Sequence, residues 1–329
     1  MGLRQEKREA VTVSIIQART RKRRSLGARI CRAFYRDKYL YLIMLLPAVY
    51  YVMFCYYPMY GVTLAFKTFK PKLGILRSPW ASEHGMKYMR MIVEDPYFWL
   101  VFKNTITLNL LNLLITFPAP IILALLLNEV GSQHYKKLVQ TVTYLPHFLS
   151  VVVIVGMMND MFNSTGIVNT GLKAIGLKPV PFLTSASAFR PMYIGSNLWQ
   201  NVGWESIIFL AALSGLDMEL YEAARIDGAG RWKQTLYVTI PGILPTIIIM
   251  LILAMGRIMN VSFQKILLMM TGGNQSVADV IPTYVYRRGI TDADFSYATG
   301  VNLFQSLVSL LFVIGTNAIS RKFSETSLW

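Results

Sequence analysis

A polar segment at residues 217–241 separates two hydrophobic stretches that are each long enough to cross a membrane. From residue 222 it reads Glu-Ala-Ala-Arg-Ile-Asp-Gly, followed by nine residues and then Val-Thr-Ile-Pro. Asp217 can accept a hydrogen bond from a free amide at the start of a helix, and the residues after it favour helical turns. Gly228 allows the left-handed backbone that ends a helix. The segment therefore predicts a short, rigid helix that is exposed to a soluble partner.

The side chains of this helix suit docking. Ala223 and Ala224 form a low surface that another backbone can approach closely, and Glu222 and Arg225 are polar anchors beside it. Pro241 has the fixed φ that suits the first turn of the next helix. The residues predicted to couple the protein to its partner, within a coupling loop at 214–241, are Glu222, Ala223, Ala224, Arg225, Asp227, Gly228 and Pro241.

This pattern resembles the EAA loop of permease subunits in binding-protein-dependent ABC importers. The signature of that family is Glu-Ala-Ala, three residues, Gly, nine residues, and Ile-x-Leu-Pro; here Val238 and Ile240 replace Ile and Leu. Many relatives have Pro where this chain has Met218, but Asp217 can still cap the helix. The resemblance implies that the short helix sits in a groove on a cytoplasmic ATPase and transmits its motion to the membrane helices.

Shorter stretches resemble the sugar-permease branch of the family: residues 66–69, 283–286 and 295–299, with an ending at 326–329 like that of a subgroup handling larger saccharides. The resemblance covers residues 38–329. Basic residues of the outer segments would suit an acidic oligosaccharide, or could equally contact a binding protein or lipid headgroups; they are Lys67, Lys70, Lys72, Arg77, Arg287 and Arg288. The resemblance implies a saccharide substrate and a second, homologous permease subunit. It also implies two ATPase subunits that bind ATP and Mg, and an extracellular or periplasmic solute-binding protein.

The composition is that of a membrane protein. The chain has 329 residues, of which 54% are hydrophobic and 15% charged, and its mean hydropathy is +0.42. Soluble domains carry about 25% charged residues, and a membrane helix needs about 20 apolar residues. Five stretches lack Asp, Glu, Lys and Arg, and a sixth contains only Glu205; in order they are Tyr39–Phe66, Asn104–Asn128, Leu138–Asn159, Pro191–Leu216, Gln234–Gly256 and Phe295–Ser320.

These runs are continuous rather than alternating, which favours helices over a membrane barrel. The expected fold is an all-α integral membrane protein with six transmembrane helices and a cytoplasmic coupling helix. Residues 39–329 are expected to form one permease domain, half of a pore. Pro118 and Pro120 should kink the second span, and the loop at 162–190 has no strong helix signal.

A net charge of +16 could indicate nucleic-acid binding, but the distribution of the charge argues against it. Twelve of the 33 Lys and Arg residues lie in the basic tail at 1–38, directly before the first span. By the positive-inside rule the tail is cytoplasmic. With six spans both termini are then cytoplasmic, and the expected location is the lipid bilayer of a bacterial plasma membrane.

Glu205 is the one acidic residue inside a predicted span, where an ionisable group is costly and usually has a function. With Gln200, Asn201 and Trp204 it is a candidate for the substrate path, and Gln264 is a weaker one. Glu205 could equally pair with a basic residue of the neighbouring subunit, or remain hydrated near the outer headgroups.

No phosphate-binding loop of the type Gly-x-x-x-x-Gly-Lys-Ser/Thr occurs, so any ATP hydrolysis must come from another polypeptide. The three His residues are scattered at spacings that do not favour a metal, and no hydrolase motif is evident. The chain is therefore expected to be a non-catalytic transport subunit without a cofactor of its own. Two alternatives are a stand-alone secondary transporter, which should carry more buried titratable groups, and a membrane scaffold.

Overall fold

A computed structural model describes residues 35–323, with side chains to residue 321. In this range every regular element is a helix, apart from one isolated β-bridge between Lys67 and Trp80. The predicted all-α fold is confirmed. The predicted basic tail at 1–38 lies outside the described residues except for its last four positions.

The chain divides into two compact units, of which the first ends at Gly61. Its described part begins with α3 (Lys38–Tyr51), continues as the π-helical turn η1 (Val52–Tyr56), and enters the 3-10 helix η2 (Tyr57–Phe66). None of the side chains in α3 is buried. An apolar helix with no buried face is what a membrane span looks like when lipid is its solvent.

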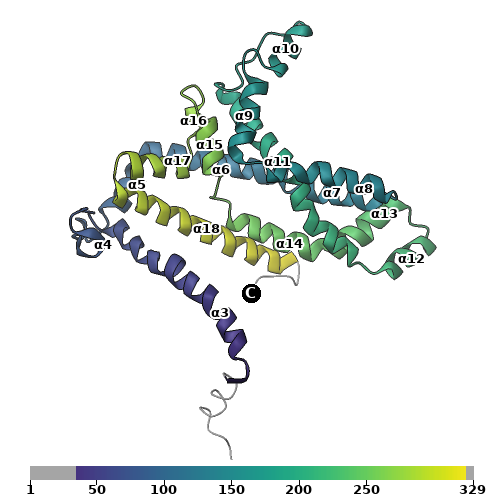
Figure 1. The fold of residues 1–329 in the computed structure, drawn as a ribbon, viewed down its shortest axis with the longest axis horizontal. Coiled ribbons are helices and arrows are strands. Elements are labelled where there is room, and N and C mark those ends of the chain that lie inside the picture. Colours follow the sequence, from purple (N-terminus) through teal and green to yellow (C-terminus); the bar gives the residue numbers. More distant parts are fainter. Residues whose placement is uncertain (1–34, 324–329) are drawn as a thin grey trace, which may run out of the picture. The chain divides into compact units, whose positions relative to one another are not determined.

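The second unit, Val62–Trp329, contains the remaining elements (Figure 1). Its first half comprises α4 (Gly74–Arg77), α5 (Lys87–Glu94), α6 (Pro96–Thr116), α7 (Pro118–Glu129), α8 (Gln133–Tyr144), η3 (Leu145–Phe148), α9 (Val151–Phe162) and α10 (Ile167–Ala174). Its second half comprises α11 (Ala186–Ser214), α12 (Met218–Ile226), α13 (Arg231–Gln234), η4 (Thr235–Thr239), α14 (Ile240–Gly256), α15 (Phe263–Met269), α16 (Gln275–Ala278), α17 (Ile281–Tyr286), η5 (Arg287–Thr291) and α18 (Phe295–Phe323).

Within the described residues, five helical segments are long and apolar enough to cross a membrane: Lys38–Phe66, Pro96–Glu129, Val151–Ala174, Arg231–Gly256 and Phe295–Arg321. Helix α11, with 29 residues, is also long enough to cross, but it is not one of the five. It carries a line of polar side chains instead. The expected count of six spans therefore stays a prediction.

Helix α11 lies at the centre of the second unit and contacts α6, α7, α8 and α14. One apolar cluster joins it to α9 and α15 through Phe189 and Ile266, and another joins it to α7 and α14 through Phe209 and Ile243. In Figure 1, α12 and α13 lie at one end of this unit and α5 at the other. Three residues separate the end of helix α11 from the start of α12, so the chain connects the central helix of the unit directly to α12.

The expected third span, 138–159, is wrong as one continuous helix. Helix α8 ends at Tyr144, η3 follows, and Ser150 is extended, with its hydroxyl accepting a hydrogen bond from the Val153 amide. Pro146 lacks an amide hydrogen, so the helix cannot continue through it without losing a backbone bond. Ser150 then caps the start of α9. The candidate span lies further along the chain, at 151–174.

The expectation of a loop without helix at 162–190 is also wrong, since α10 and the first turn of α11 fall inside it. Asn169 holds this region together: it is fully buried, its side-chain amide donates to the Asn163 carbonyl, and its oxygen accepts from the Val180 amide.

The predicted break near Pro118 is confirmed, because α6 ends at Thr116 and α7 begins at Pro118.

Gly203 tests the packing of α11. A Cβ at this position would collide with the backbone carbonyl of Thr143 in α8, whereas at Gly195 in the same helix it would meet nothing within 4 Å. Gly203→Ala should destabilise the protein by about 1–3 kcal/mol through overpacking. Gly195→Ala is the matched control and should be neutral or slightly stabilising. Thermal unfolding of the purified protein measures both, and equal melting temperatures would contradict the close approach of α8 and α11.

Candidate functional site: the coupling loop and the polar face of helix α11

A helix lies where the sequence predicts it, between Asp217 and Gly228: this is α12, Met218–Ile226. The Asp217 carboxylate accepts a hydrogen bond of 2.9 Å from the Glu219 amide. This bond satisfies one of the amides that have no partner within the helix, and the negative charge suits the positive end of the helix dipole. The helix therefore begins at a fixed residue.

Its other end is equally well defined. Gly228 has φ +74°. Its amide donates to the Arg225 carbonyl at 3.0 Å, and the Ala229 amide donates to the Ala224 carbonyl at 2.9 Å. This pair of bonds is the Schellman motif, which requires a left-handed residue that glycine adopts without steric cost.

Two contacts join α12 and the segment before it to the helices that follow in the chain. The Tyr221 and Thr239 hydroxyls lie 2.9 Å apart and form a hydrogen bond between α12 and η4. A Cβ at Gly242 would lie 2.5 Å from Cδ2 of Leu216, so the segment before α12 packs directly on the backbone of α14. These contacts hold the start of the coupling loop against η4 and α14.

No residue of α12 is buried. Ala224 is half-buried, and the other predicted coupling residues are exposed, namely Glu222, Ala223, Arg225, Asp227, Gly228 and Pro241. Three large side chains of the loop are exposed as well: Ile226 by 87%, Trp232 by 77% and Tyr237 by 76%. These three side chains were not among the predicted coupling residues, although large apolar residues in a polar loop are a usable signal. An exposed apolar patch in a polar rim is typical of an interaction site.

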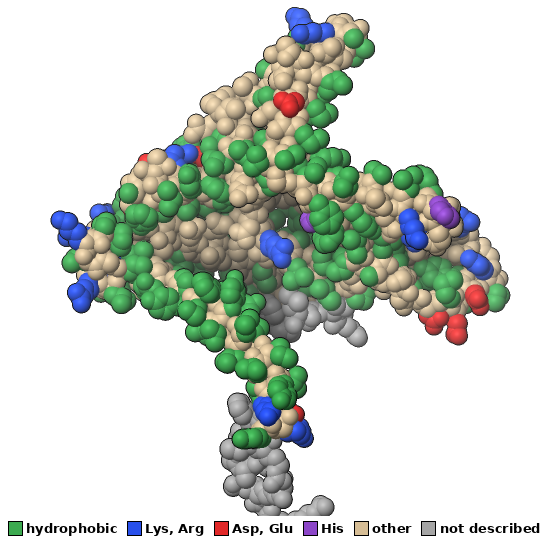
Figure 2. Space-filling model, in the orientation of Figure 1, with side chains coloured by type: hydrophobic (Ala, Val, Ile, Leu, Met, Phe, Trp, Pro, Cys, Tyr) green, Lys and Arg blue, Asp and Glu red, His purple; other side chains and the backbone are tan. Residues whose placement is uncertain are grey.

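Acidic side chains accompany this apolar surface. Asp217, Glu219, Glu222 and Asp227 are all exposed. Figure 2 shows Asp and Glu side chains gathered at the end of the unit where α12 lies. A partner groove that receives α12 should therefore combine apolar and basic side chains.

A second group of functional candidates lies on α11. The polar face of α11 consists of Asn197, Gln200, Asn201, Trp204 and Glu205. Gln200 is buried, Asn201 is half-buried, and Trp204 and Glu205 are exposed. The structure thus brings four predicted substrate-path residues onto one helix. Gln264, the fifth, is exposed on α15.

Lys265, next to Gln264, makes the contact between α15 and this face. Its ammonium group donates to Asn197 Oδ1 at 2.7 Å, Gln200 Oε1 at 3.0 Å and Ser196 Oγ at 3.3 Å. Asn197 in turn donates to Asn112 Oδ1 of α6 at 3.1 Å. Sequence reasoning missed Asn197 and Ser196, because their partner lies more than 60 residues away.

The interrupted helix around η3 supports the polar face from the other side. The His147 ring stacks on Trp204 with 4.6 Å between centroids, and its Nδ1 lies 3.0 Å from Asn201 Oδ1. The Gln200 amide reaches the Leu149 carbonyl at 3.4 Å. The break in the helix thus leaves the Leu149 carbonyl without a helical partner, and Gln200 on the polar face of α11 donates a hydrogen bond to it. Among the described residues, no cluster of His, Cys, Asp and Glu could hold a metal.

A network of carboxylates, tyrosines and arginine joins the start of α6 to α16, α17 and α18. Asp95 accepts from the Tyr284 and Tyr297 hydroxyls at 2.7 and 3.0 Å. Asp279, almost fully buried, accepts from the Tyr97 hydroxyl at 2.5 Å and pairs with Arg287 at 2.6 Å. These bonds fix the end of the unit opposite α12.

Hydrogen bonds favour the ionised form of Asp95. Burial opposes the charged form of Asp95, but hydrogen bonds from the Tyr284 hydroxyl, the Tyr97 amide and the Tyr297 hydroxyl outweigh it and hold the pKa of Asp95 below its usual value. Burial raises the pKa of Tyr284 to about 12, so its hydroxyl remains a donor.

Five apolar helical segments and an exposed helix that is capped at both ends are the features of a membrane transport permease. The chain belongs to the family described as "Binding-protein-dependent transport system inner membrane component", whose sequence model matches residues 116–325. The resemblance stated from the coupling loop is confirmed.

Two curated relatives come from Bacillus subtilis (strain 168). The protein LplB is 42% identical over 298 residues, which cover 90% of this chain and 93% of LplB. The polygalacturonan/rhamnogalacturonan transport system permease protein YteP is 38% identical, with 98% of each chain covered.

Solved structures agree with these relatives. A chain in the crystal structure of a bacterial ABC transporter involved in the import of the acidic polysaccharide alginate is 40% identical, with a TM-score of 0.83. The match covers 90% of this chain and 99% of that chain. The alginate transporter in complex with its pentasaccharide-bound periplasmic protein matches with the same TM-score and 39% identity, over 91% of this chain and 100% of that chain.

Gly228 tests the coupling loop. Gly228→Asp places a side chain at φ +74°, where even Asp costs up to about 1–2 kcal/mol, and should disrupt the end of α12. Uptake should be abolished while membrane insertion remains normal. Gly230→Asp is the matched control, because Gly230 has φ −67° at the start of α13, where Asp is a favoured cap. Normal uptake by the Gly228 variant would remove the coupling assignment.

Asp95 gives a pH-dependent prediction. Because its pKa is lower in the folded protein, its stabilising effect is present above the ordinary carboxyl pKa of about 4 and is lost as pH falls through the depressed value. Asp95→Asn keeps the shape and the capping oxygen but removes the charge. The melting temperature of the variant should be lower than that of the wild type at pH 7, and the difference should narrow toward pH 3. A constant difference across this range would contradict an ionised Asp95.

Proposed function

We propose that this chain is the permease subunit of a saccharide importer, driven by two cytoplasmic ATPase subunits and paired with a second, homologous permease. The observation that carries the proposal is α12, which has no buried residue and is capped at both ends. A helix of this kind can transmit a rigid-body movement, because its ends are fixed by hydrogen bonds rather than by packing against its own chain.

The identity of the cargo rests on the relatives. YteP is a permease for polygalacturonan and rhamnogalacturonan, and the solved transporter imports alginate with a saccharide-bound periplasmic protein. Both relationships cover nearly the whole chain. A saccharide delivered by a solute-binding protein, extracellular or periplasmic, is therefore the proposed substrate.

The proposed coupling begins in the partner ATPase, where ATP and Mg bind and closure of the two subunits supplies the movement. Ala223 and Ala224 allow the wall of the groove to approach, and Glu222 and Arg225 are the polar anchors. The hydrogen bond between Tyr221 and Thr239 carries the displacement of α12 into η4 and α14. Leu216 carries it into α11, and the cavity between the two permeases alternates between outward and inward access.

The polar face of α11 is the proposed lining of the substrate path. Asn201 offers amide groups to sugar hydroxyls, and Trp204, 43% exposed, offers an aromatic surface to a sugar ring. Glu205 either contacts substrate or pairs with a basic residue of the second permease. Gln264, exposed on α15, is a further contact.

The proposed orientation places the coupling loop and both termini in the cytoplasm of a bacterium, with the chain spanning its plasma membrane several times. The basic tail at 1–38 supports this orientation by the positive-inside rule. In this orientation the Asp95 and Asp279 network lies at the outer end of the second unit, where the solute-binding protein docks.

Copurification tests the proposal. The chain is expressed with its genomic neighbours, purified through its own tag, and placed in lipid nanodiscs. A second permease and an ATPase should copurify, and solute-binding protein loaded with saccharide should stimulate ATP hydrolysis. A chain that purifies alone and transports without ATP would instead be a secondary transporter. A chain with no substrate dependence would be a scaffold.

A further inference from the structure

Among the described residues, the two cations that lie on or against α11 have no acidic partner. Lys265 is 1% exposed, and Arg190 is half-buried. Among the described residues, neither lies within 4.0 Å of a carboxylate, although Arg90, Arg287 and Arg288 all form ion pairs. A buried charge usually acquires a counter-ion, because leaving water costs several kcal/mol per ion. The lack of one here needs a reason.

Lys265 forms hydrogen bonds to neutral groups only, so its contacts do not neutralise its charge. Its three hydrogen-bond acceptors, Ser196 Oγ, Asn197 Oδ1 and Gln200 Oε1, are all neutral oxygens on α11. Three acceptors satisfy the three N–H donors of an ammonium group. Burial lowers the pKa of Lys265 to about 8, so the ammonium group is still charged at pH 7. Its neutral acceptors on α11 do not cancel that charge.

Arg190 lies on α11, about two turns before Asn197. One of its terminal nitrogens donates to Asn104 Oδ1 at 3.3 Å, and its buried Nε has no hydrogen-bond partner. An ideal helix turns about 100° per residue, so Arg190, Asn197 and Asn201 fall within about 40° of one another. Arg190 therefore extends the polar face of α11.

Together these residues form one electrostatic stripe. From Arg190 to Trp204 it spans 14 residues, or about 21 Å at 1.5 Å per residue. It carries two positive charges, and Glu205 at its far end is the one carboxylate of α11. In a medium of low dielectric constant such charges act over many ångströms, so Lys265 can influence a passing ligand without touching it.

We infer that Lys265, assisted by Arg190, makes this permease selective for saccharides that carry carboxylates, such as oligosaccharides of uronic acids. The inference rests on the proposed function, which assigns the polar face of α11 to the substrate path. Lys265 is a specificity-determining residue that acts through its field, while Asn201 and Trp204 contact the sugar. Rings of Arg and Lys select anions in membrane pores by the same principle. The acidic polymer handled by the solved alginate transporter fits this reading.

The test uses the complete complex in nanodiscs, with its solute-binding protein saturated by one of two probes. The probes are trigalacturonate and its fully methyl-esterified form, which has the same sugars without the charges. Calorimetry confirms that the binding protein is loaded in each case. The rate of saccharide-stimulated ATP hydrolysis is then measured for the wild type and for each variant.

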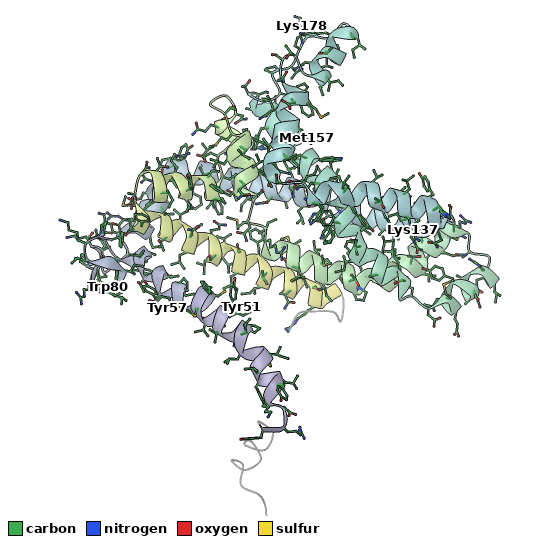
Figure 3. All side chains as sticks on the ribbon, viewed as in Figure 1. Tyr51, Tyr57, Trp80, Lys137, Met157 and Lys178 are labelled. Atoms are coloured by element: carbon green, nitrogen blue, oxygen red, sulfur yellow. The ribbon has the colours of Figure 1, made fainter. Side chains whose placement is uncertain are left out.

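Lys265→Gln removes the charge and keeps an amide donor. It should lower the apparent affinity of the complex for the trigalacturonate-loaded protein about tenfold, as expected for one charge acting across roughly 10 Å, and leave the response to the ester unchanged. Lys265→Arg should retain the preference, and Arg190→Gln should weaken it. Lys178→Gln is the matched control, since Lys178 is exposed at the tip of the α9–α10 arm in Figure 3 and should change neither response.

The possible failures are distinguishable. An equal loss with both probes would show that Lys265 only ties α15 to α11, and it would overturn the inference. An unchanged preference in Lys265→Gln would also overturn it. Melting temperatures identify a variant that has lost its fold, and Lys265→Arg and Arg190→Gln then decide the outcome. If the wild-type complex responds to no saccharide at all, the proposed function itself has failed.

Discussion

The second unit depends on the need to satisfy polar groups inside a bundle that has few charges and little water. Helix α11 is where this requirement is greatest, because its polar side chains need hydrogen-bond partners on the surrounding helices. Lys265 of α15, Asn112 of α6 and His147 of η3 provide them. Each bond joins segments that are far apart in sequence. The same polar groups that would be costly in isolation therefore specify how the helices are arranged.

The coupling loop follows the opposite principle. Its helix is held by local hydrogen bonds at Asp217 and Gly228, and the loop keeps large apolar side chains such as Trp232 exposed. Rigidity that comes from capping leaves the outer surface free for a partner. One end of the second unit is thus locally fixed and open to docking, and the centre is fixed by long-range contacts. The contacts of Leu216 and Tyr221 join this end of the second unit to α14 and η4.

Local chemistry made much of this predictable. The bounds of α12, its cap at Asp217 and its termination at Gly228 involve residues a few positions apart, so the sequence specifies them fully. The break near Pro118 was predictable for the same reason, because the proline itself interrupts the helix. The single span expected over 138–159 failed because apolar composition does not report how a helix is interrupted. Pro146 and Ser150 act together there, and the freed Leu149 carbonyl needs Gln200 from another helix.

The sequence by itself determined the class of protein, the membrane-spanning character and the docking helix, since composition and short-range hydrogen bonding decide these. Tertiary structure alone decided which polar residues meet. Glu205, marked as the one acid in a span, is exposed, while Lys265 is buried against the polar face of α11. Nothing in the spacing of Lys265 indicates that Asn197 and Gln200 will surround it. Long-range contacts depend on how whole helices pack, and that information is distributed over the entire chain.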